Sequence, residues 1–144
     1  MASNVCTRLL QKRWRPYEVE NIPRIEGIYV IGISRLSEEA EVIYVGRSND
    51  VHRRLVEHQR QHLAIDEYIK EQFQDNDGED LRVKWITDHN QEIKEREYIY
   101  CIAEKVGYWP KYNIKRWAAL NSNSDWTECV YRVENFVINQ FIAQ

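Results

Sequence analysis

Two runs rich in β-branched and aromatic residues, 27–34 (GIYVIGIS) and 41–46 (EVIYVG), constrain the fold of this chain more than any other feature. Their length and composition are typical of β-strands, and the polar segment 35–40 between them suits a hairpin loop. A third run, 81–87 (LRVKWIT), alternates between apolar and polar side chains, as a half-buried strand does. The sequence therefore predicts a small sheet whose first two strands are antiparallel neighbours.

Helices are predicted on either side of these strands, because apolar residues recur at helical spacing and capping residues precede them. The expected helices cover residues 7–13, about 50–62, 63–73, 91–106 and, with a strong apolar stripe, 125–141. This order favours an α+β fold with a small three-stranded antiparallel sheet flanked by helices and an extra C-terminal helix.

The chain of 144 residues is expected to form one domain, 1–144, since it contains no repeat or linker. No apolar run approaches the roughly 18 residues of a membrane span, and the N-terminus lacks the apolar stretch of a signal peptide. The three cysteines, Cys6, Cys101 and Cys129, are widely spaced and predict reduced thiols. We therefore expect an intracellular protein, cytoplasmic or nuclear, without a membrane partner.

The charges are unevenly distributed along the chain. The net charge of −3 argues mildly against nucleic-acid binding, but seven of the acidic residues fall within residues 64–80. Basic residues cluster elsewhere, so a polyanion would meet a local basic face. The alternative interpretation is that these are ordinary solvated surface charges. The candidate contacts to nucleic acid are Arg47, Arg53, Arg60, Lys111, Lys115 and Arg116.

A set of residues spread over these predicted elements resembles the GIY-YIG nuclease family. The two named tripeptides are present as residues 27–29 (GIY) and 44–46 (YVG), and four polar residues follow them in the family's order: Arg54, His58, Glu97 and Asn113. The resemblance covers about residues 26–114. The gap between the two tyrosines is longer than is typical, and valine replaces isoleucine in the second tripeptide. Residues 1–25 and the helical segment 115–144 would be extensions of the family core.

The resemblance implies an endonuclease that hydrolyses DNA phosphodiester bonds with one divalent ion, Mg²⁺ or Mn²⁺. A carboxylate is the minimum that a protein contributes to such an ion, and Glu97 is the candidate. The alternative is a surface glutamate paired with Lys94 or Arg96. Arginine holds a phosphate with two hydrogen bonds and stays charged, so Arg54 is assigned to the scissile phosphate.

The family mechanism implies a tyrosine that takes the proton of the attacking water. We assign this role to Tyr29 and the role of hydrogen-bond partner or water-positioning group to Tyr44, with the reverse assignment also open. His58 shares a helix face with Arg54, so it could relay a proton or hold a phosphate, or it could be a core histidine.

Gly46 and Asn113 each have both a functional and a purely structural interpretation. Gly46 would allow close approach of a phosphate or a packed tyrosine, or simply end its strand. Asn113 would tie its loop to the catalytic face, or be a turn asparagine.

The resemblance implies DNA, either duplex or branched, as the partner. The chain contains no recognisable sequence-reading motif, so we expect structure-selective or weakly specific cleavage. The C-terminal helix could form a homodimer or pack on its own domain. A catalytically silent nucleic-acid-binding or adaptor module is the main functional alternative. A protein-interaction domain with a chance motif is the third.

Overall fold

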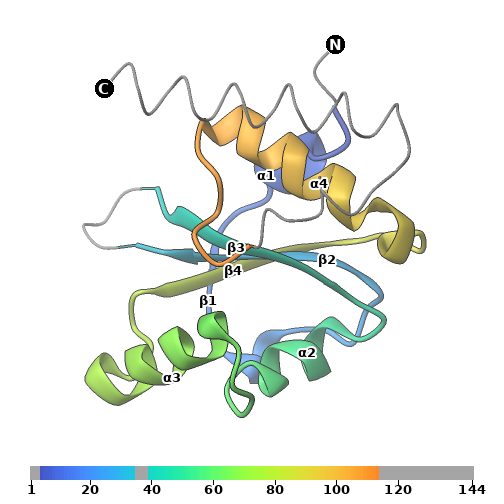
Figure 1. The fold of residues 1–144 in the computed structure, drawn as a ribbon. Helices are drawn as coiled ribbons and strands as arrows, with labels where there is room; N and C mark the ends of the chain where they lie inside the picture. Colours follow the sequence, from blue (N-terminus) through green and yellow to red (C-terminus); the bar gives the residue numbers. More distant parts are fainter. Residues whose placement is uncertain (1–3, 35–38, 114–144) are drawn as a thin grey trace.

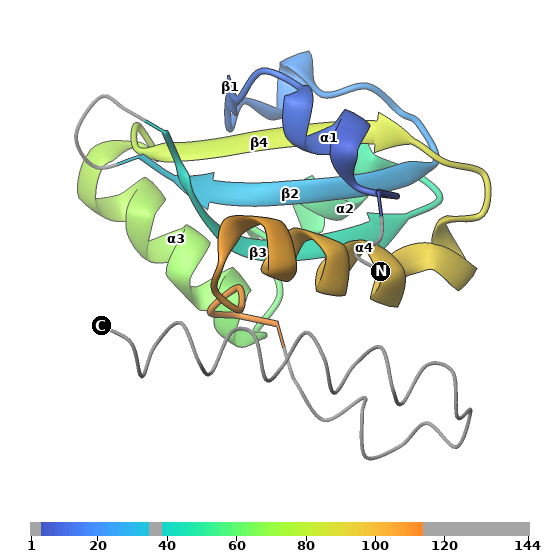
Figure 2. The ribbon, with the colours of Figure 1, turned by 90° about the horizontal axis from the view of Figure 1, so that it is seen from above.

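The computed structural model describes residues 4–34 and 39–113. These residues form an antiparallel sheet between two layers of helices (Figures 1 and 2). The strands are β1 (Arg15–Pro16), β2 (Gly27–Ile33), β3 (Glu41–Ser48) and β4 (Leu81–Thr87), and the helices are α1 (Thr7–Gln11), the 3-10 helix η1 (Val19–Asn21), α2 (Val51–Glu57), α3 (Ala64–Asn76) and α4 (Gln91–Val106). The α+β class is therefore confirmed. The predicted C-terminal helix lies outside the described residues.

The sheet has four strands in the order β1-β4-β2-β3, so the prediction of three strands is wrong. The additional strand, β1, consists of two residues, with Arg15 opposite Val83 and Pro16 opposite Arg82. Two residues are too few to show strand periodicity. Proline has no backbone N–H and is tolerated at a sheet edge, which is where β1 lies.

The helices cover both faces of the sheet and bury the inner strand β2 completely. Helices α1 and α4 lie on one face, and α2 and α3 lie on the other (Figure 1). On the first face Ile28 and Val30 of β2 pack with Ile99 of α4, and on the second face Ile31 packs with Leu55 of α2. Every residue of β2 is buried because both of its side-chain rows are covered.

A disulfide joins Cys6, at the start of α1, to Cys101 in α4. The expectation of reduced thiols is therefore wrong for these two cysteines. The two residues are 95 positions apart in the sequence, and they meet only because α1 and α4 cover the same face of the sheet. Cys129 lies outside the described residues.

The segment predicted as a helix to about residue 62 contains a break. Asp50 caps α2 by accepting a hydrogen bond from the Arg53 N–H, as expected, but the helix ends at Glu57. A new helix, α3, starts at Ala64 because the Asp66 carboxylate accepts the Leu63 N–H at 2.9 Å. Among the described residues, no helix is both long and apolar enough to cross a membrane.

Candidate active site

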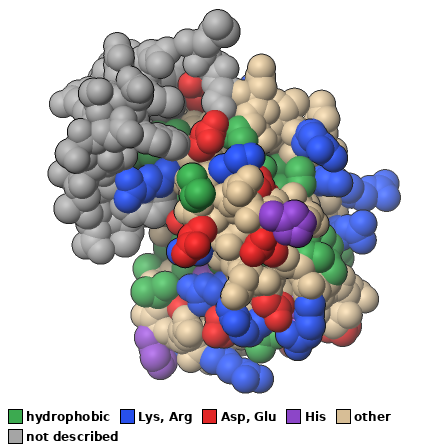
Figure 3. Space-filling model, turned by 90° about the vertical axis from the view of Figure 1, so that its right-hand side faces the viewer, with side chains coloured by type: hydrophobic (Ala, Val, Ile, Leu, Met, Phe, Trp, Pro, Cys, Tyr) green, Lys and Arg blue, Asp and Glu red, His purple; other side chains and the backbone are tan. Residues whose placement is uncertain are grey.

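A cleft of about 600 Å³ opens beside β3, at the end of the sheet where β2 begins and β3 ends. It is lined by Glu26, Tyr29, Tyr44, Arg47, Ser48, Asn49, Arg53, Arg54, Gln91, Glu92 and Glu95. Basic and acidic side chains are intermixed on this end of the molecule (Figure 3). The cleft therefore receives side chains from the sheet, from α2 and from the first two turns of α4.

The two strand tyrosines lie on the same face of the sheet. Tyr29 is directly opposite Gly46, and Tyr44 is opposite Ile31, so the tyrosines are diagonal neighbours with ring centroids 6.2 Å apart. A Cβ atom on Gly46 would lie 2.4 Å from the Tyr29 hydroxyl. Glycine is therefore required here because the Tyr29 ring crosses the backbone. The interpretation of Gly46 as a strand end is wrong, since β3 continues to Ser48.

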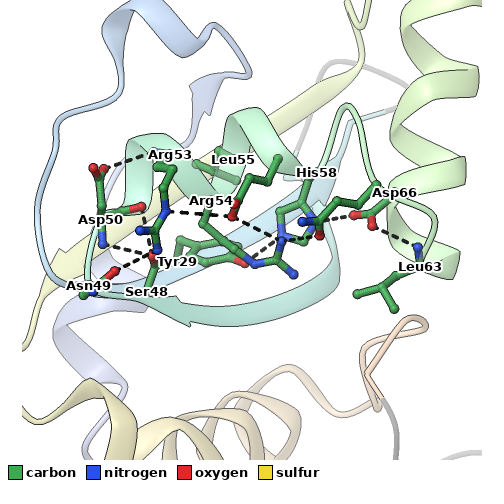
Figure 4. A network of polar contacts seen from close by, with 12 residues as sticks. Tyr29, Ser48, Asn49, Asp50, Arg53, Arg54, Leu55, His58, Leu63 and Asp66 are labelled. Atoms are coloured by element: carbon green, nitrogen blue, oxygen red, sulfur yellow. Dashed lines mark hydrogen bonds and ion pairs between the residues drawn. The ribbon is translucent and has the colours of Figure 1, made fainter.

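The hydroxyl of Tyr29 begins a chain of buried hydrogen bonds (Figure 4). It lies 2.7 Å from Nε2 of His58, whose Nδ1 lies 2.5 Å from Oδ1 of Asp66. The other carboxylate oxygen of Asp66 accepts the Leu63 N–H. Tyr29, His58 and Asp66 are all buried, and Tyr29 is the member of the chain that borders the cleft.

The partners of His58 determine which of its nitrogens carries the proton. A carboxylate oxygen is an acceptor, so Nδ1–H donates to Asp66 and Nε2 is left without a proton. Nε2 therefore accepts the hydrogen bond from the Tyr29 hydroxyl. The sequence analysis assigned no role to Asp66, which lies in the acid-rich segment 64–80, and its position as the third residue of α3 was the available signal.

Burial sets the protonation states around the cleft. It raises the pKa of the Tyr29 hydroxyl well above 10. Neighbouring Tyr44 raises this pKa further, and the charge of Arg54 opposes the shift. Burial also raises the pKa of Tyr44, with a further contribution from Glu95. The pKa of His58 is lowered by burial, although Asp66 opposes the shift. His58 is therefore neutral at neutral pH and able to accept a proton.

Arg54 lies on the flank of α2 that faces the cleft, as the sequence predicted. Its guanidinium donates to Gln61 at 2.9 Å and lies 3.7 Å from Glu57, and its side chain is 20% exposed. The positive charge of Arg54 acts on both tyrosines, because it opposes the rise in pKa that burial causes in each. Arg54 thus combines an electrostatic effect on both tyrosines with access to a ligand in the cleft.

Helix α4 contributes two carboxylates to the cleft, exposed Glu92 and the more buried Glu95, and Glu97 is not among the lining residues. Residues two apart on a helix point about 200° away from one another, so only one of Glu95 and Glu97 can face the cleft. Burial raises the pKa of Glu95, and Arg47, 3.6 Å away, opposes that shift. The spacing of Ile93, Glu97 and Cys101 along the sequence would put Glu97 on an apolar stripe of the helix, but Ile93 is 78% exposed.

The predicted basic contacts are only partly brought together. Arg47 and Arg53 line the cleft, whereas Arg60 and Lys111 do not. Lys115 and Arg116 lie outside the described residues. Arg47 and Arg53 both have acidic neighbours, because Arg47 faces Glu95 and Arg53 lies 3.9 Å from Glu57. The local charge of the cleft is therefore mixed.

Asn113 ties its loop to β3, as the sequence predicted. Its side-chain oxygen accepts the Val45 N–H and its side-chain nitrogen donates to the Val45 carbonyl, both at 2.9 Å. The indole N–H of Trp109 donates to the Asn113 carbonyl. Because β3 is an edge strand, this amide satisfies backbone groups that a further strand would otherwise pair, and it fixes the strand between Tyr44 and Gly46.

The carboxylates of the cleft suit only an ion that takes few ligands from the protein. Among residues 4–34 and 39–113, no group of three or more His, Cys, Asp or Glu side chains could hold a metal. A Mg²⁺ ion commonly keeps several waters and uses one or two carboxylates together with substrate phosphate oxygens. Glu95, partly buried beside Tyr44, fits that role because its charged form is disfavoured by burial and would be stabilised by a cation.

Comparison of the chain with known protein families, with curated proteins and with solved structures finds no match.

Proposed function

We propose that this protein is a metal-dependent endonuclease of the GIY-YIG kind that hydrolyses DNA phosphodiester bonds. The observation that carries the proposal is the convergence of Tyr29, Tyr44, Arg54 and Glu95 on one cleft. The order of the motif residues along the chain supports it further, with Glu95 in place of Glu97. The core would cover about residues 26–114.

In this proposal Tyr29 is the base, because its hydroxyl has a proton acceptor behind it. The phenol is too weakly acidic to ionise alone, since burial raises its pKa. When the attacking water gives its proton to the Tyr29 oxygen, the phenolic proton passes to Nε2 of His58. The resulting imidazolium is stabilised by Asp66, in the manner of a histidine–aspartate pair in a hydrolase triad.

The hydroxide then attacks the phosphorus, and the bond from phosphorus to the 3′ oxygen breaks. The leaving 3′ oxygen takes a proton from solvent water, and the His58 imidazolium afterwards releases its extra proton, which restores the starting state of the site. Arg54 holds the phosphate and stabilises its developing negative charge. Tyr44 orients the water beside Tyr29. A divalent ion on Glu95, when bound, would neutralise charge on the phosphate oxygens. The products would carry 5′-phosphate and 3′-hydroxyl ends.

The test compares two glutamates on the same helix. Wild type, Glu95→Gln and Glu97→Gln are incubated with labelled duplex, nicked, branched and single-stranded DNA, with Mg²⁺, Mn²⁺ or EDTA. We expect metal-dependent cleavage by wild type and Glu97→Gln and a loss of about 10²-fold or more in Glu95→Gln. Failure of the wild type to cleave any of these substrates would overturn the proposal.

A catalytically silent module is the second candidate. The 3.6 Å pair between Arg47 and Glu95 favours it, since an arginine already compensates the carboxylate that the ion would use. Such a module would bind DNA equally well in Mg²⁺ and in EDTA and would cleave none of the substrates. The same incubations therefore separate the two candidates.

A further inference from the structure

A second cavity, of about 230 Å³, runs along the outer edge of β4. The pairing of β1 with β4 stops at Arg15 and Val83, so the last residues of β4 have no strand on that side. We call this cavity the β4 groove. It is lined by Lys12, Arg13, Arg15, Pro23, Ile25, Lys84, Trp85, Ile86 and Thr87.

The lining of the β4 groove is basic. Four of its lining residues are cations and none is an acid. In the described part of the chain, none of these four cations has a carboxylate within 4.0 Å, whereas Arg24, Arg47 and Arg54 each do. Basic side chains gather over this edge of the sheet, on the right of Figure 3. In a chain with net charge −3, this local excess attracts polyanions.

Lys84 places a buried charge on the wall of this groove. The residue is 4% exposed, and its ammonium donates to the Leu10 carbonyl at 3.1 Å and lies 4.3 Å from the centre of the Trp14 ring. Both partners are neutral, and burial lowers the pKa of the lysine, although the charge of Glu39 opposes the shift. An anion in the groove would supply the opposite charge that these partners lack.

The groove also offers an aromatic surface. Trp85 is half-buried, and the guanidinium of Arg15 lies 5.5 Å from the centre of its ring. Cations that contact phosphates, combined with aromatic side chains that contact bases, are typical of surfaces that bind nucleic-acid strands. An inorganic anion would need only the cations.

The β4 groove and the cleft lie on one row of the sheet. Gly27 is paired with Ser48, which lines the cleft, and with Thr87, which lines the groove. Two strand spacings separate Ser48 from Thr87, which is about 10 Å. That distance equals the rise of about three base pairs along the axis of duplex DNA.

We propose that the β4 groove binds the backbone of the nucleic acid whose scissile phosphate lies in the cleft, within about three base pairs of that position. The path of the strand rests on the proposed function. Binding in the groove does not, because it needs neither metal nor turnover.

The test measures binding in EDTA by the fluorescence polarisation of a short labelled duplex, as a function of salt. Lys12→Ala/Arg13→Ala removes two exposed cations of the groove. The matched control, Lys70→Ala/Lys105→Ala, removes two cations that line neither cavity. We expect the groove variant to bind at least about tenfold more weakly at 0.1 M salt, with a log–log salt slope reduced by about 2, and the control to match wild type.

Charge reversal, Lys12→Glu/Arg13→Glu, should weaken binding further while the thermal unfolding temperature stays within a few degrees of wild type. Equal losses in the groove variant and the control would overturn the proposal, since net charge alone would explain them. Displacement of the DNA by polyglutamate at equal charge concentration would overturn the assignment to nucleic acid. A groove effect on binding without cleavage by wild type would support the groove and refute the nuclease proposal.

Discussion

The Nδ1 atom of His58 lies 2.5 Å from Oδ1 of Asp66, and neither side chain is exposed. The pair spans the break between α2 and α3, because Asp66 also accepts the Leu63 N–H at the start of α3. One carboxylate thus starts a helix and sets the proton position on the histidine. The start of α3 and the acceptor behind Tyr29 therefore have the same physical origin.

Asp66→Asn should reverse the tautomer of His58. The Leu63 N–H requires an acceptor, so the amide oxygen would turn to it and the amide NH2 would face Nδ1. His58 would then carry its proton on Nε2 and could no longer accept from Tyr29. We expect cleavage to slow by about 10²- to 10⁴-fold in kcat with little change in KM. Nitrogen chemical shifts of His58 report the tautomer, and a wild-type tautomer in the variant would contradict the argument.

Removing each tyrosine hydroxyl separately should identify the base. Tyr29→Phe leaves Nε2 of buried His58 without its partner, which should cost about 1–3 kcal/mol of stability and reduce cleavage to background. Tyr44→Phe removes no hydrogen bond to His58, so it should retain part of the activity and more of the stability. Rates and urea unfolding of both variants decide the point. The opposite ranking of rates would assign the base to Tyr44.

Sequence periodicity predicted the long elements well. The strand over residues 81–87 and the helix over 91–106 have the boundaries that the sequence indicated, because each has a clear apolar pattern and a turn or glycine beyond it. The neighbouring positions of Tyr29 and Tyr44 also followed from the hairpin. The disulfide and β1 did not, because both depend on contacts between segments far apart in the sequence.

The candidate site shows where a pattern of residue types is insufficient. Glu95 and Glu97 are equally polar, and only the packing of α4 on β3 decides which of them faces the cleft. Exposed Ile93 suggested the wrong helix face. Asp66 was hidden in a run of acids, since sequence alone does not show that His58 lies beside it.

The stability of the fold should fall as the pH is lowered through the range in which an unfolded histidine titrates. Burial lowers the pKa of His58 in the folded state, so the unfolded chain binds a proton first, near pH 6.5. Neutral His58 contributes to the free energy of unfolding above pH 6.5. This contribution is lost between pH 6.5 and the lower pKa of the folded state, at up to about 1.4 kcal/mol per pH unit.

Urea unfolding between pH 7.5 and about 5 measures this loss. Glu95, whose pKa is raised, acts in the opposite direction at lower pH, so the comparison is made in Glu95→Gln. Stability that rises as the pH falls below 6.5 in that variant would show that His58 gains its charge more readily in the folded state, contrary to its burial.

Gly46→Ala should damage the site through Tyr29 without removing any polar group. The new Cβ atom would lie 2.4 Å from both the hydroxyl oxygen and the Cζ atom of Tyr29, so the ring must move away from His58 or the strand must bend. We expect a loss of about 1–3 kcal/mol in stability and a weaker Tyr29–His58 hydrogen bond, with slower cleavage.

Gly107→Ala is the control, because a Cβ atom there meets nothing within 4 Å and only the positive φ of 87° opposes it. That variant should lose about 1 kcal/mol and keep its activity. Equal loss of cleavage in both variants would show that Gly46 matters for backbone freedom and not for the position of the Tyr29 ring.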